Sequence, residues 1–178
     1  MRQCIDKAKP YARSVGVAHW PCGATLNRSK MAPIISQRLL EIVEALPLTH
    51  GLRVLEIGCG TGVAAREIAK RIGNGNVLAI DRSAKAIEQA IRSSQTEINK
   101  GTLRFLQAKI ETFELPENQQ KFDLALAVRV GALDGRHPEL EQQALLKIAA
   151  ALTDNGKLFI DGGNPLKEKP LPWPNRTT

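Results

Sequence analysis

The stretch "VLEIGCGTGVAAREIAKR", residues 54–71, places three glycines at alternate positions between a short apolar run and a run with helical spacing. Gly58 and Gly60 can adopt backbone angles that are closed to other residues, and without side chains they let a ligand touch the main chain. Such a turn is expected where a strand leads directly into a helix. The stretch therefore predicts a strand, a glycine-rich turn and a helix, with a ligand bound against the turn.

The spacing of these glycines separates the turn from two kinds of loop that bind phosphate groups. A dinucleotide site requires G-x-G-x-x-G, but here the third glycine is Gly62, and Val63 holds the position that this pattern reserves for glycine. A P-loop requires Gly-Lys-Ser/Thr after the turn, and none follows. The spacing therefore disfavours a nicotinamide-dependent oxidoreductase and a P-loop enzyme.

Apolar runs typical of strands alternate with helical patterns from about residue 33 onward. Strands are expected at 53–57, 76–81, 103–107, 122–128 and 156–161. Strands separated by helices imply right-handed crossovers and a parallel sheet with helices on both faces. We predict an α/β fold with a doubly wound, mostly parallel, Rossmann-like sheet. Its ligand should lie at the carboxyl ends of the middle strands, where the glycine turn falls.

The chain after the fifth expected strand is short and rich in proline. Only 17 residues follow Asp161, and they include Pro165, Pro170, Pro172 and Pro174. Because proline cannot donate to a strand ladder, we expect the sheet to stop at five strands. This tail or a second subunit would then cover the open edge, which makes a homodimer possible. We accordingly divide the chain into a basic N-terminal extension or lid (1–32), a core domain (33–161) and a Pro-rich basic tail (162–178).

The net charge of +7 belongs to the two ends of the chain. Residues 1–32 contain six basic residues and one acidic residue, and residues 162–178 contain three basic and one acidic. Basic ends can attract an anionic partner, so RNA stays possible, although the sequence contains no RNA-binding motif. Aromatic residues make up only 4% of the chain, which argues against a protein that stacks single-stranded bases on aromatic side chains.

The apolar runs and the cysteines indicate the surroundings of the protein. No uninterrupted run approaches the roughly 20 apolar residues that span a bilayer, so we expect no membrane role. The cysteines, Cys4, Cys22 and Cys59, form no CxxC pair, which disfavours a metal knuckle or a disulfide framework and fits a reducing compartment. We therefore expect a cytoplasmic protein without a bound metal.

Four blocks of the sequence together resemble one enzyme family. They are "VLEIGCGTG", an acid at Asp81 that ends the second expected strand, "FDLALAV" at 122–128 and "LTDNGKLFI" at 152–160. In this order, over roughly residues 33–161, they resemble the class I methyltransferases that use S-adenosylmethionine. The resemblance implies that S-adenosylmethionine is the cofactor and that its methyl group passes in line to an acceptor.

The resemblance also implies which residues contact the cofactor around the turn. The methionine portion and the sulfonium would lie beside Gly58, Cys59 and Gly60, and Glu56 would organise the loop and the amino-acid end. Glu56 also fits a carboxylate that only holds the turn, and Cys59 fits a small filler better than a nucleophile. Asp81 would accept both ribose hydroxyls, and a charged acceptor contributes about 1.5–3 kcal/mol to such bonds. An acid at that position also serves NAD-type cofactors.

The adenine end departs from the pattern of the family. Arg82 could lie against the adenine or could be solvated. In the segment after the third strand, members of the family often place an aspartate that accepts from the adenine amino group, but here Lys109 holds that position. Because lysine only donates, recognition would rest on main-chain groups near Ile110, on apolar walls or on Glu111.

The segment "RVGALDGRHPEL", residues 129–140, would border the acceptor. The resemblance implies that its first residues, beginning with Arg129, pass under the sulfonium. It is not the Asn/Asp-Pro-Pro-Tyr sequence of methyltransferases that act on base or amide nitrogens, so a small-molecule acceptor is favoured. Asp134 and His137 are candidate general bases, which only an unreactive, protonated acceptor would need. His137 also fits a structural role at a helix start, before Pro138.

Two functions remain open from the sequence. The first is an S-adenosylmethionine-dependent methyltransferase that acts on a small molecule, with Tyr11, His19 and Trp20 lining a lid over the acceptor. The second is a methyltransferase-like module that binds a ligand or regulates a partner without catalysis. Lys109 and the short C-terminus favour the second, whereas the glycine turn, Glu56 and Asp81 favour the first.

Overall fold

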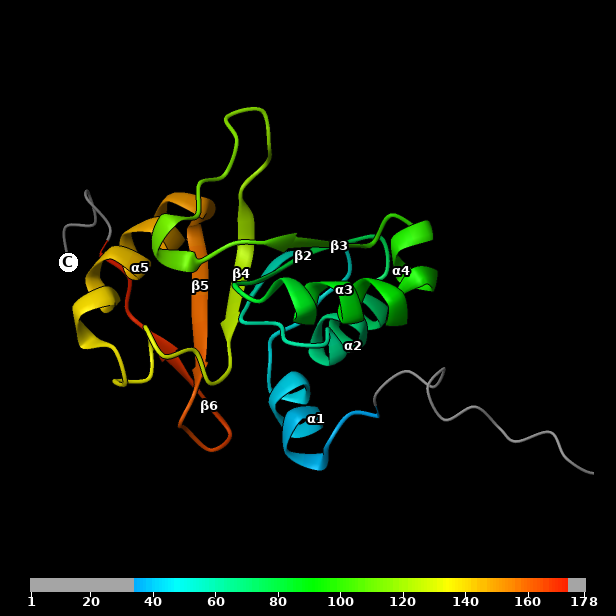
Figure 1. Cartoon of the computed structure of the whole chain (residues 1–178), viewed down its shortest axis with the longest axis horizontal. Coiled ribbons are helices and arrows are strands. Elements are labelled where there is room, and N and C mark those ends of the chain that lie inside the picture. The colour runs from blue at the N-terminus through cyan, green and yellow to red at the C-terminus, as the bar shows by residue number, and fades with distance from the viewer. Residues whose placement is uncertain (1–33, 173–178) are drawn as a thin grey trace, which may run out of the picture.

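The computed structural model of the chain describes residues 34–172, which form one α/β unit (Figure 1). Its elements are α1 (Gln37–Glu44), β1 (Arg53–Ile57), α2 (Val63–Arg71), β2 (Asn76–Asp81), α3 (Ala84–Ser93), α4 (Gln95–Asn99), β3 (Leu103–Gln107), η2 (Ile110–Thr112), β4 (Phe122–Ala127), α5 (Pro138–Ala151), β5 (Leu152–Asp161) and β6 (Leu166–Lys169). The expected basic extension at 1–32, with its proposed lid residues Tyr11, His19 and Trp20, lies outside the described residues.

The strands form one sheet in the order β3-β2-β1-β4-β5-β6. Every pair among β1 to β5 is parallel, and helices lie in the crossovers, so the predicted doubly wound architecture is confirmed. The strand order reverses between β1 and β4, and Ile57 of β1 is paired with Ile80 on one side and Ala127 on the other. The carboxyl ends of β1, β2 and β4 therefore meet at one edge, where open α/β sheets bind their ligands.

The expectation of five strands is wrong by one strand. Residues 166–169 of the tail form β6, which pairs antiparallel with β5 from Leu158↔Lys169 to Asp161↔Leu166. The strand lies between Pro165 and Pro170, so none of its own residues lacks the N–H that a ladder needs. The prolines therefore limit the length of this strand without preventing it, and the tail itself covers the edge of β5.

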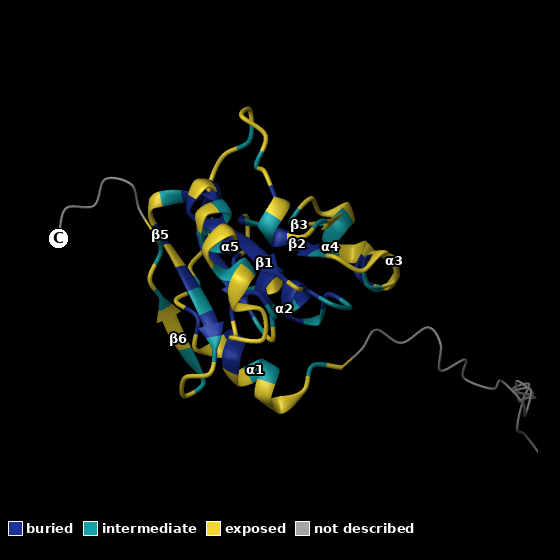
Figure 2. Cartoon of the chain, turned by 60° about the vertical axis from the view of Figure 1, so that its left-hand side comes forward, coloured by how far each residue is buried: buried dark blue, intermediate teal, exposed yellow. Residues whose placement is uncertain are grey.

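Side chains of the strands alternate between two apolar layers on the two faces of the sheet. On one face, Val54 of β1 packs in a cluster with residues of α1, α2 and α3, and on the other, Leu55 packs in a cluster with residues of α5 and η2. The strands are consequently the most deeply buried part of the molecule, between helices with exposed outer surfaces (Figure 2). Because Glu56 alternates with Leu55, its carboxyl group lies on the side of α1 and α2.

Local sequence features mark where the helices begin. The hydroxyl of Ser36 accepts a hydrogen bond from the N–H of Leu39 at the start of α1, and Ser83 does the same for Ala86 at the start of α3. Such caps satisfy backbone donors that have no partner within the helix. In α5, Pro138 occupies the first position, where its missing N–H costs nothing.

Candidate functional site

The glycine turn connects β1 to α2 and has the backbone that the sequence predicts. Gly58 and Gly60 have positive φ angles of 71° and 54°, and Gly62, which precedes α2, has a φ of 72°. A Cβ atom on Gly58 would lie 2.8 Å from Val130 Cγ2, and one on Gly62 would lie 2.7 Å from Phe105 Cζ. At Gly60 no heavy atom outside this residue and its two chain neighbours lies within 4 Å of that position. Gly58 and Gly62 thus permit close packing, and Gly60 leaves open space.

Asp81 ties the end of β2 to this turn. Its Oδ2 accepts a hydrogen bond of 2.8 Å from the N–H of Gly60, and its Oδ1 accepts one of 2.8 Å from the N–H of Ser83. A carboxylate has about four acceptor positions, so each oxygen can still accept a further bond. Asp81 can therefore hold the turn and bind a hydroxyl group of a ligand at once.

Two cavities meet at the turn. The first, which we call the β2 cavity, has a volume of about 210 Å³ and is bordered by the ends of β1 and β2, by the segment that follows β4, by η2 and by the start of α5. The second, the α1 cavity, has a volume of about 220 Å³ and lies between α1, the turn, the start of α2 and the residues after β4. Gly58 and Arg129 line both cavities, so the two cavities lie next to each other on either side of these residues.

Glu56 is a buried carboxyl group at the wall of the α1 cavity. Only 5% of the residue is exposed, and its Oε2 has no hydrogen-bond partner. Burial raises the pKa of Glu56 from 4.5 to about 8; the nearby charge of Asp81 also raises it, while the N–H of Ala65 and the charge of Arg66 lower it. One part of this group thus stabilises the first turn of α2, and the other is an unpaired acceptor that a cationic ligand would satisfy.

The family of the chain follows from comparison with known proteins. Residues 48–175 match a family model described as a methyltransferase domain. The chain belongs to this methyltransferase family. Together with the fold, the match makes it a class I methyltransferase, the family whose cofactor is S-adenosylmethionine.

Curated relatives carry methyltransferase names. The chain is 31% identical over 148 residues to O-methyltransferase rstn1 of Aspergillus nomiae, which is 80% of this chain and 63% of that relative. It is 28% identical over 121 residues to the mitochondrial ubiquinone biosynthesis O-methyltransferase of Dictyostelium discoideum, which is 65% of this chain and 36% of that relative. The chain therefore spans less than two thirds of the length of either relative.

Solved structures share the fold. A methyltransferase from Thiobacillus denitrificans in complex with S-adenosyl-L-homocysteine is 21% identical and superposes with a TM-score of 0.56, covering 74% of this chain and 50% of that chain. The [4+2]-cyclase SpnF is 26% identical and also gives a TM-score of 0.56, covering 69% of this chain and 43% of that chain. The fold of this methyltransferase domain is therefore one that a protein named as a cyclase also adopts.

The structure brings most of the sequence-predicted cofactor residues to the two cavities. Residues at the β2 cavity are Gly58, Asp81, Arg82, Ile110 and Arg129, and those at the α1 cavity are Glu56, Gly58, Cys59 and Arg129. Gly60 takes part through its bond to Asp81. Lys109, which holds the position of the family's aspartate, and the alternatives Ile110 and Glu111 all line the β2 cavity. The residues that the resemblance implies for the cofactor are thus neighbours in space.

Cys59 has the properties of a structural residue. Its thiol is buried, and its pKa is strongly raised, first by burial and then by the negative charges of Glu56 and Asp81. A nucleophilic cysteine needs a stabilised thiolate, so this environment opposes such a role. The interpretation of Cys59 as a small filler within the turn agrees with these surroundings.

The two candidate bases occupy different positions. Asp134 is not among the residues that line either cavity; it forms an ion pair of 2.7 Å with Arg136, and this hydrogen bond lowers the pKa of Asp134. His137 lines the β2 cavity and stands directly before Pro138 at the start of α5, although its side chain makes no capping hydrogen bond. Its Nδ1 lies 3.4 Å from Glu139 Oε1. Neither group borders the α1 cavity.

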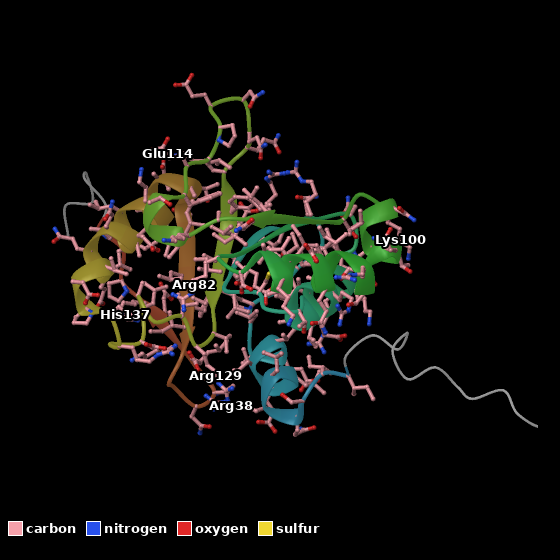
Figure 3. All side chains as sticks on the ribbon, viewed as in Figure 1. Arg38, Arg82, Lys100, Glu114, Arg129 and His137 are labelled. Atoms are coloured by element: carbon pink, nitrogen blue, oxygen red, sulfur yellow. The ribbon has the colours of Figure 1, made fainter. Side chains whose placement is uncertain are left out.

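Two arginines of the site were not found from the sequence. Arg38 of α1 lines the α1 cavity and lies beside Arg129 (Figure 3), and Arg136 lines the β2 cavity. Arg38 precedes the first expected strand and has no motif around it, and only the packing of α1 against the sheet brings it to the turn. The spacing of Arg136 from Asp134 was visible, but not the direction of its side chain.

The described part of the chain contains neither a metal-binding cluster nor a membrane-spanning helix. Between residues 34 and 172, no cluster of three or more His, Cys, Asp or Glu side chains could hold a metal ion. Over the same residues, no helix has both the length and the apolar character needed to cross a bilayer.

Proposed function

We propose that this domain binds S-adenosylmethionine across the two neighbouring cavities and directs its methyl group in line to a small-molecule acceptor. The observation that carries the proposal is the buried Glu56, whose Oε2 has no partner and borders the α1 cavity. A ligand with an ammonium group at one end would satisfy it. At the other end of the turn, Asp81 has acceptor positions left for ribose hydroxyls.

The nucleoside half of the cofactor fits the β2 cavity. Asp81 would accept from the ribose, and the apolar side chains of Ala108 and Ile110 would contact the adenine. Because Lys109 cannot accept from the adenine amino group, we assign that role to Glu111 or to the main chain at Ile110. Arg82 would lie along the open side of the base.

The amino-acid half fits the α1 cavity. The carboxylate of Glu56 would bind the ammonium group, and the guanidinium groups of Arg38 and Arg129 would bind the carboxylate. Groups of opposite charge in the lining of one cavity match a zwitterion. Open space at Gly60 would let the ligand approach the main chain.

Methyl transfer mainly requires that the acceptor be positioned correctly relative to the cofactor. The cofactor supplies an activated methyl group on a sulfonium, and the protein holds the acceptor in line with it; good alignment of this kind contributes roughly 7–11 kcal/mol. His137 lies on the nucleoside side of the site, so we assign it to the helix start and not to proton removal. The names of the relatives favour an oxygen acceptor on a small molecule.

The alternative function is a methyltransferase-like module without methyl transfer. Lys109 at the adenine position and a structural neighbour named as a [4+2]-cyclase favour it. Transfer of a labelled methyl group from S-adenosylmethionine to a panel of hydroxylated small molecules distinguishes the two. RNA belongs in the same panel because of the basic ends, and product formed on RNA alone would replace the small-molecule acceptor.

The remaining expectations concern assembly, location and domain limits. Because β6 covers β5, the open edge that suggested a homodimer is now the edge of β6, which carries Lys167, Glu168 and Lys169. Charged side chains on an edge strand discourage pairing with another edge. We therefore propose a monomeric domain in which β6 belongs to the core unit that begins near residue 33. The cytoplasmic location that we propose rests on the pattern of cysteines. Light scattering of the purified protein tests the monomer.

The cofactor assignment is tested by calorimetric titration with S-adenosylmethionine, S-adenosylhomocysteine and NAD. We expect binding of the first two and no binding of NAD, because the turn lacks the dinucleotide spacing. Binding of NAD alone, or of none of the three, would contradict the proposal.

A further inference from the structure

Arg129 has an unusual backbone for its residue type. It follows β4 at the wall shared by the two cavities, and its φ is 56°, the only positive φ of a non-glycine residue that the structure records in the described part of the chain. Residues other than glycine rarely adopt this left-handed backbone conformation. Where one does so, the surrounding structure holds it there. The contacts of the Arg129 peptide groups therefore show what maintains the shared wall.

Charged groups from elsewhere in the chain hold both peptide groups of Arg129. Its N–H donates a hydrogen bond of 3.0 Å to Asp161 Oδ1, and its carbonyl oxygen accepts one of 2.6 Å from Arg136 Nη2. The guanidinium of Arg136 is in turn fixed by Asp134, with bonds of 3.0 Å from Nε to each carboxylate oxygen and 2.7 Å from Nη2 to Oδ2. Hydrogen bonds that involve a charged group are stronger than neutral ones.

Asp161 also connects this peptide to α1. It is the last residue of β5, only 12% of its side chain is exposed, and its Oδ2 lies 3.2 Å from Arg38 Nη2. One carboxylate thus holds Arg129, which lines both cavities, and Arg38, which lines the α1 cavity. The next residue, Val130, packs against Gly58 at a distance that leaves no room for a Cβ atom. A shift of Arg129 would consequently move the glycine turn.

We infer that Asp161 and Arg136 are positioning residues that clamp the Arg129 peptide in its left-handed conformation and so maintain the wall between the two cavities. Asp134 acts through Arg136 in this arrangement and has no role as a base. The effect of the clamp on ligand binding rests on the proposed function, because it assumes that the two cavities hold the cofactor. Its effect on the backbone of Arg129 does not depend on any ligand.

The clamp is tested by a double-mutant cycle between Asp161→Ala and Arg129→Gly. Glycine adopts a positive φ without strain, so it no longer needs the clamp. With Arg129 present, we expect Asp161→Ala to weaken the binding of S-adenosylhomocysteine by about fivefold or more. In the Arg129→Gly protein, Asp161→Ala should weaken the binding of S-adenosylhomocysteine by less than about twofold. Equal losses in the two proteins would overturn the inference, because Asp161 would then act independently of the strained backbone.

A matched control exists at the opposite end of the sheet. The carboxylate of Asp123 accepts a hydrogen bond of 2.9 Å from the N–H of Arg53, which is the same kind of bond as that from Arg129 to Asp161. Asp123→Ala should lower the melting temperature without changing the affinity for S-adenosylhomocysteine. Arg136→Gln serves as a second variant if Asp161→Ala does not fold, and its effect should likewise disappear in the Arg129→Gly protein.

Hydrogen exchange separates the clamp from the proposed function. In the ligand-free protein, Asp161→Ala should speed exchange of the Arg129 amide by at least about tenfold, because this N–H loses its acceptor. Asp161→Asn keeps an oxygen acceptor and should leave this amide protected. Unchanged exchange in Asp161→Ala would refute the clamp even if S-adenosylhomocysteine binds. If the wild-type protein fails to bind S-adenosylhomocysteine, the proposed function fails, and the exchange experiment still decides on the clamp.

Discussion

Glu56 and Asp81 are two carboxyl groups on either side of one glycine turn, and the protein places them in opposite environments. Asp81 at the β2 cavity accepts backbone N–H groups through both oxygens, at 2.8 Å each. Glu56 at the α1 cavity is buried with one oxygen unpaired, and burial raises its pKa to about 8. The difference teaches that Asp81 is already part of the loop structure, whereas Glu56 carries a cost in the free protein that a cationic ligand would remove.

The largest expected effect comes from the unpaired group. Glu56→Gln should weaken the binding of S-adenosylmethionine by about thirtyfold or more, because truncating one side of a buried ion pair typically costs 2–5 kcal/mol. Calorimetric titration of the two proteins with S-adenosylmethionine measures this loss of affinity. The affinity of the wild-type protein should also rise with pH from about 6 to 8, because binding requires Glu56 to lose its proton. Glu56→Gln should abolish this pH dependence, and a dependence that persists would assign the proton to another group.

Asp81→Ala should have the next largest effect. Loss of the ribose contacts should weaken the binding of S-adenosylmethionine by at least about tenfold, given 1.5–3 kcal/mol for hydrogen bonds to a charged group. The loss of its bond to Gly60 should also lower the melting temperature. Asp123→Ala removes a comparable bond far from the cavities, so it should lower the melting temperature without weakening the binding of S-adenosylmethionine. Similar affinity losses in both variants would show that Asp81 acts through stability alone.

A smaller effect concerns the stability of the ligand-free protein. The pKa of Glu56 is higher in the folded protein, at about 8, than its ordinary value of 4.5. Its contribution to stability is therefore complete below about pH 4.5 and is lost as the pH rises through about 8. We expect the melting temperature to fall by roughly 5 °C between pH 5.5 and 8.5, and the decrease to be much smaller in Glu56→Gln. Calorimetric melting curves without ligand measure this.

The smallest effect is expected at Cys59, whose pKa both carboxyl groups raise. Because its pKa is strongly raised, the thiol should not react with iodoacetamide at pH 8 while the protein is folded. Cys59→Ala should change the affinity for S-adenosylmethionine by less than about twofold. Mass spectrometry of the alkylated protein checks the first statement. Rapid modification of Cys59 would contradict the burial of its thiol near these two negative charges.

The parts of the site that follow from short-range rules were predictable. Alternate glycines after an apolar run indicate a left-handed turn because few other residues tolerate such angles, and Gly58 and Gly60 have them. An acid at the end of the second strand lies beside that turn because parallel strands end at one edge. The sixth strand was missed because the expectation of five strands treated the four prolines of the tail as excluding any strand. The run between Pro165 and Pro170 contains no proline and is long enough for a short strand.

The sequence by itself determined the five parallel strands, the glycine turn and the place of Asp81 at a strand end, because steric limits and side-chain alternation act between residues close along the chain. Only the tertiary structure decided how each charged group is used. Arg38 meets Asp161 across 123 residues of sequence, and Asp134 turns away from the cavities to hold Arg136. Burial and charge pairing depend on every element packed around a group, so Glu56 becomes a proton-holding carboxyl only once α1, α2 and the sheet enclose it.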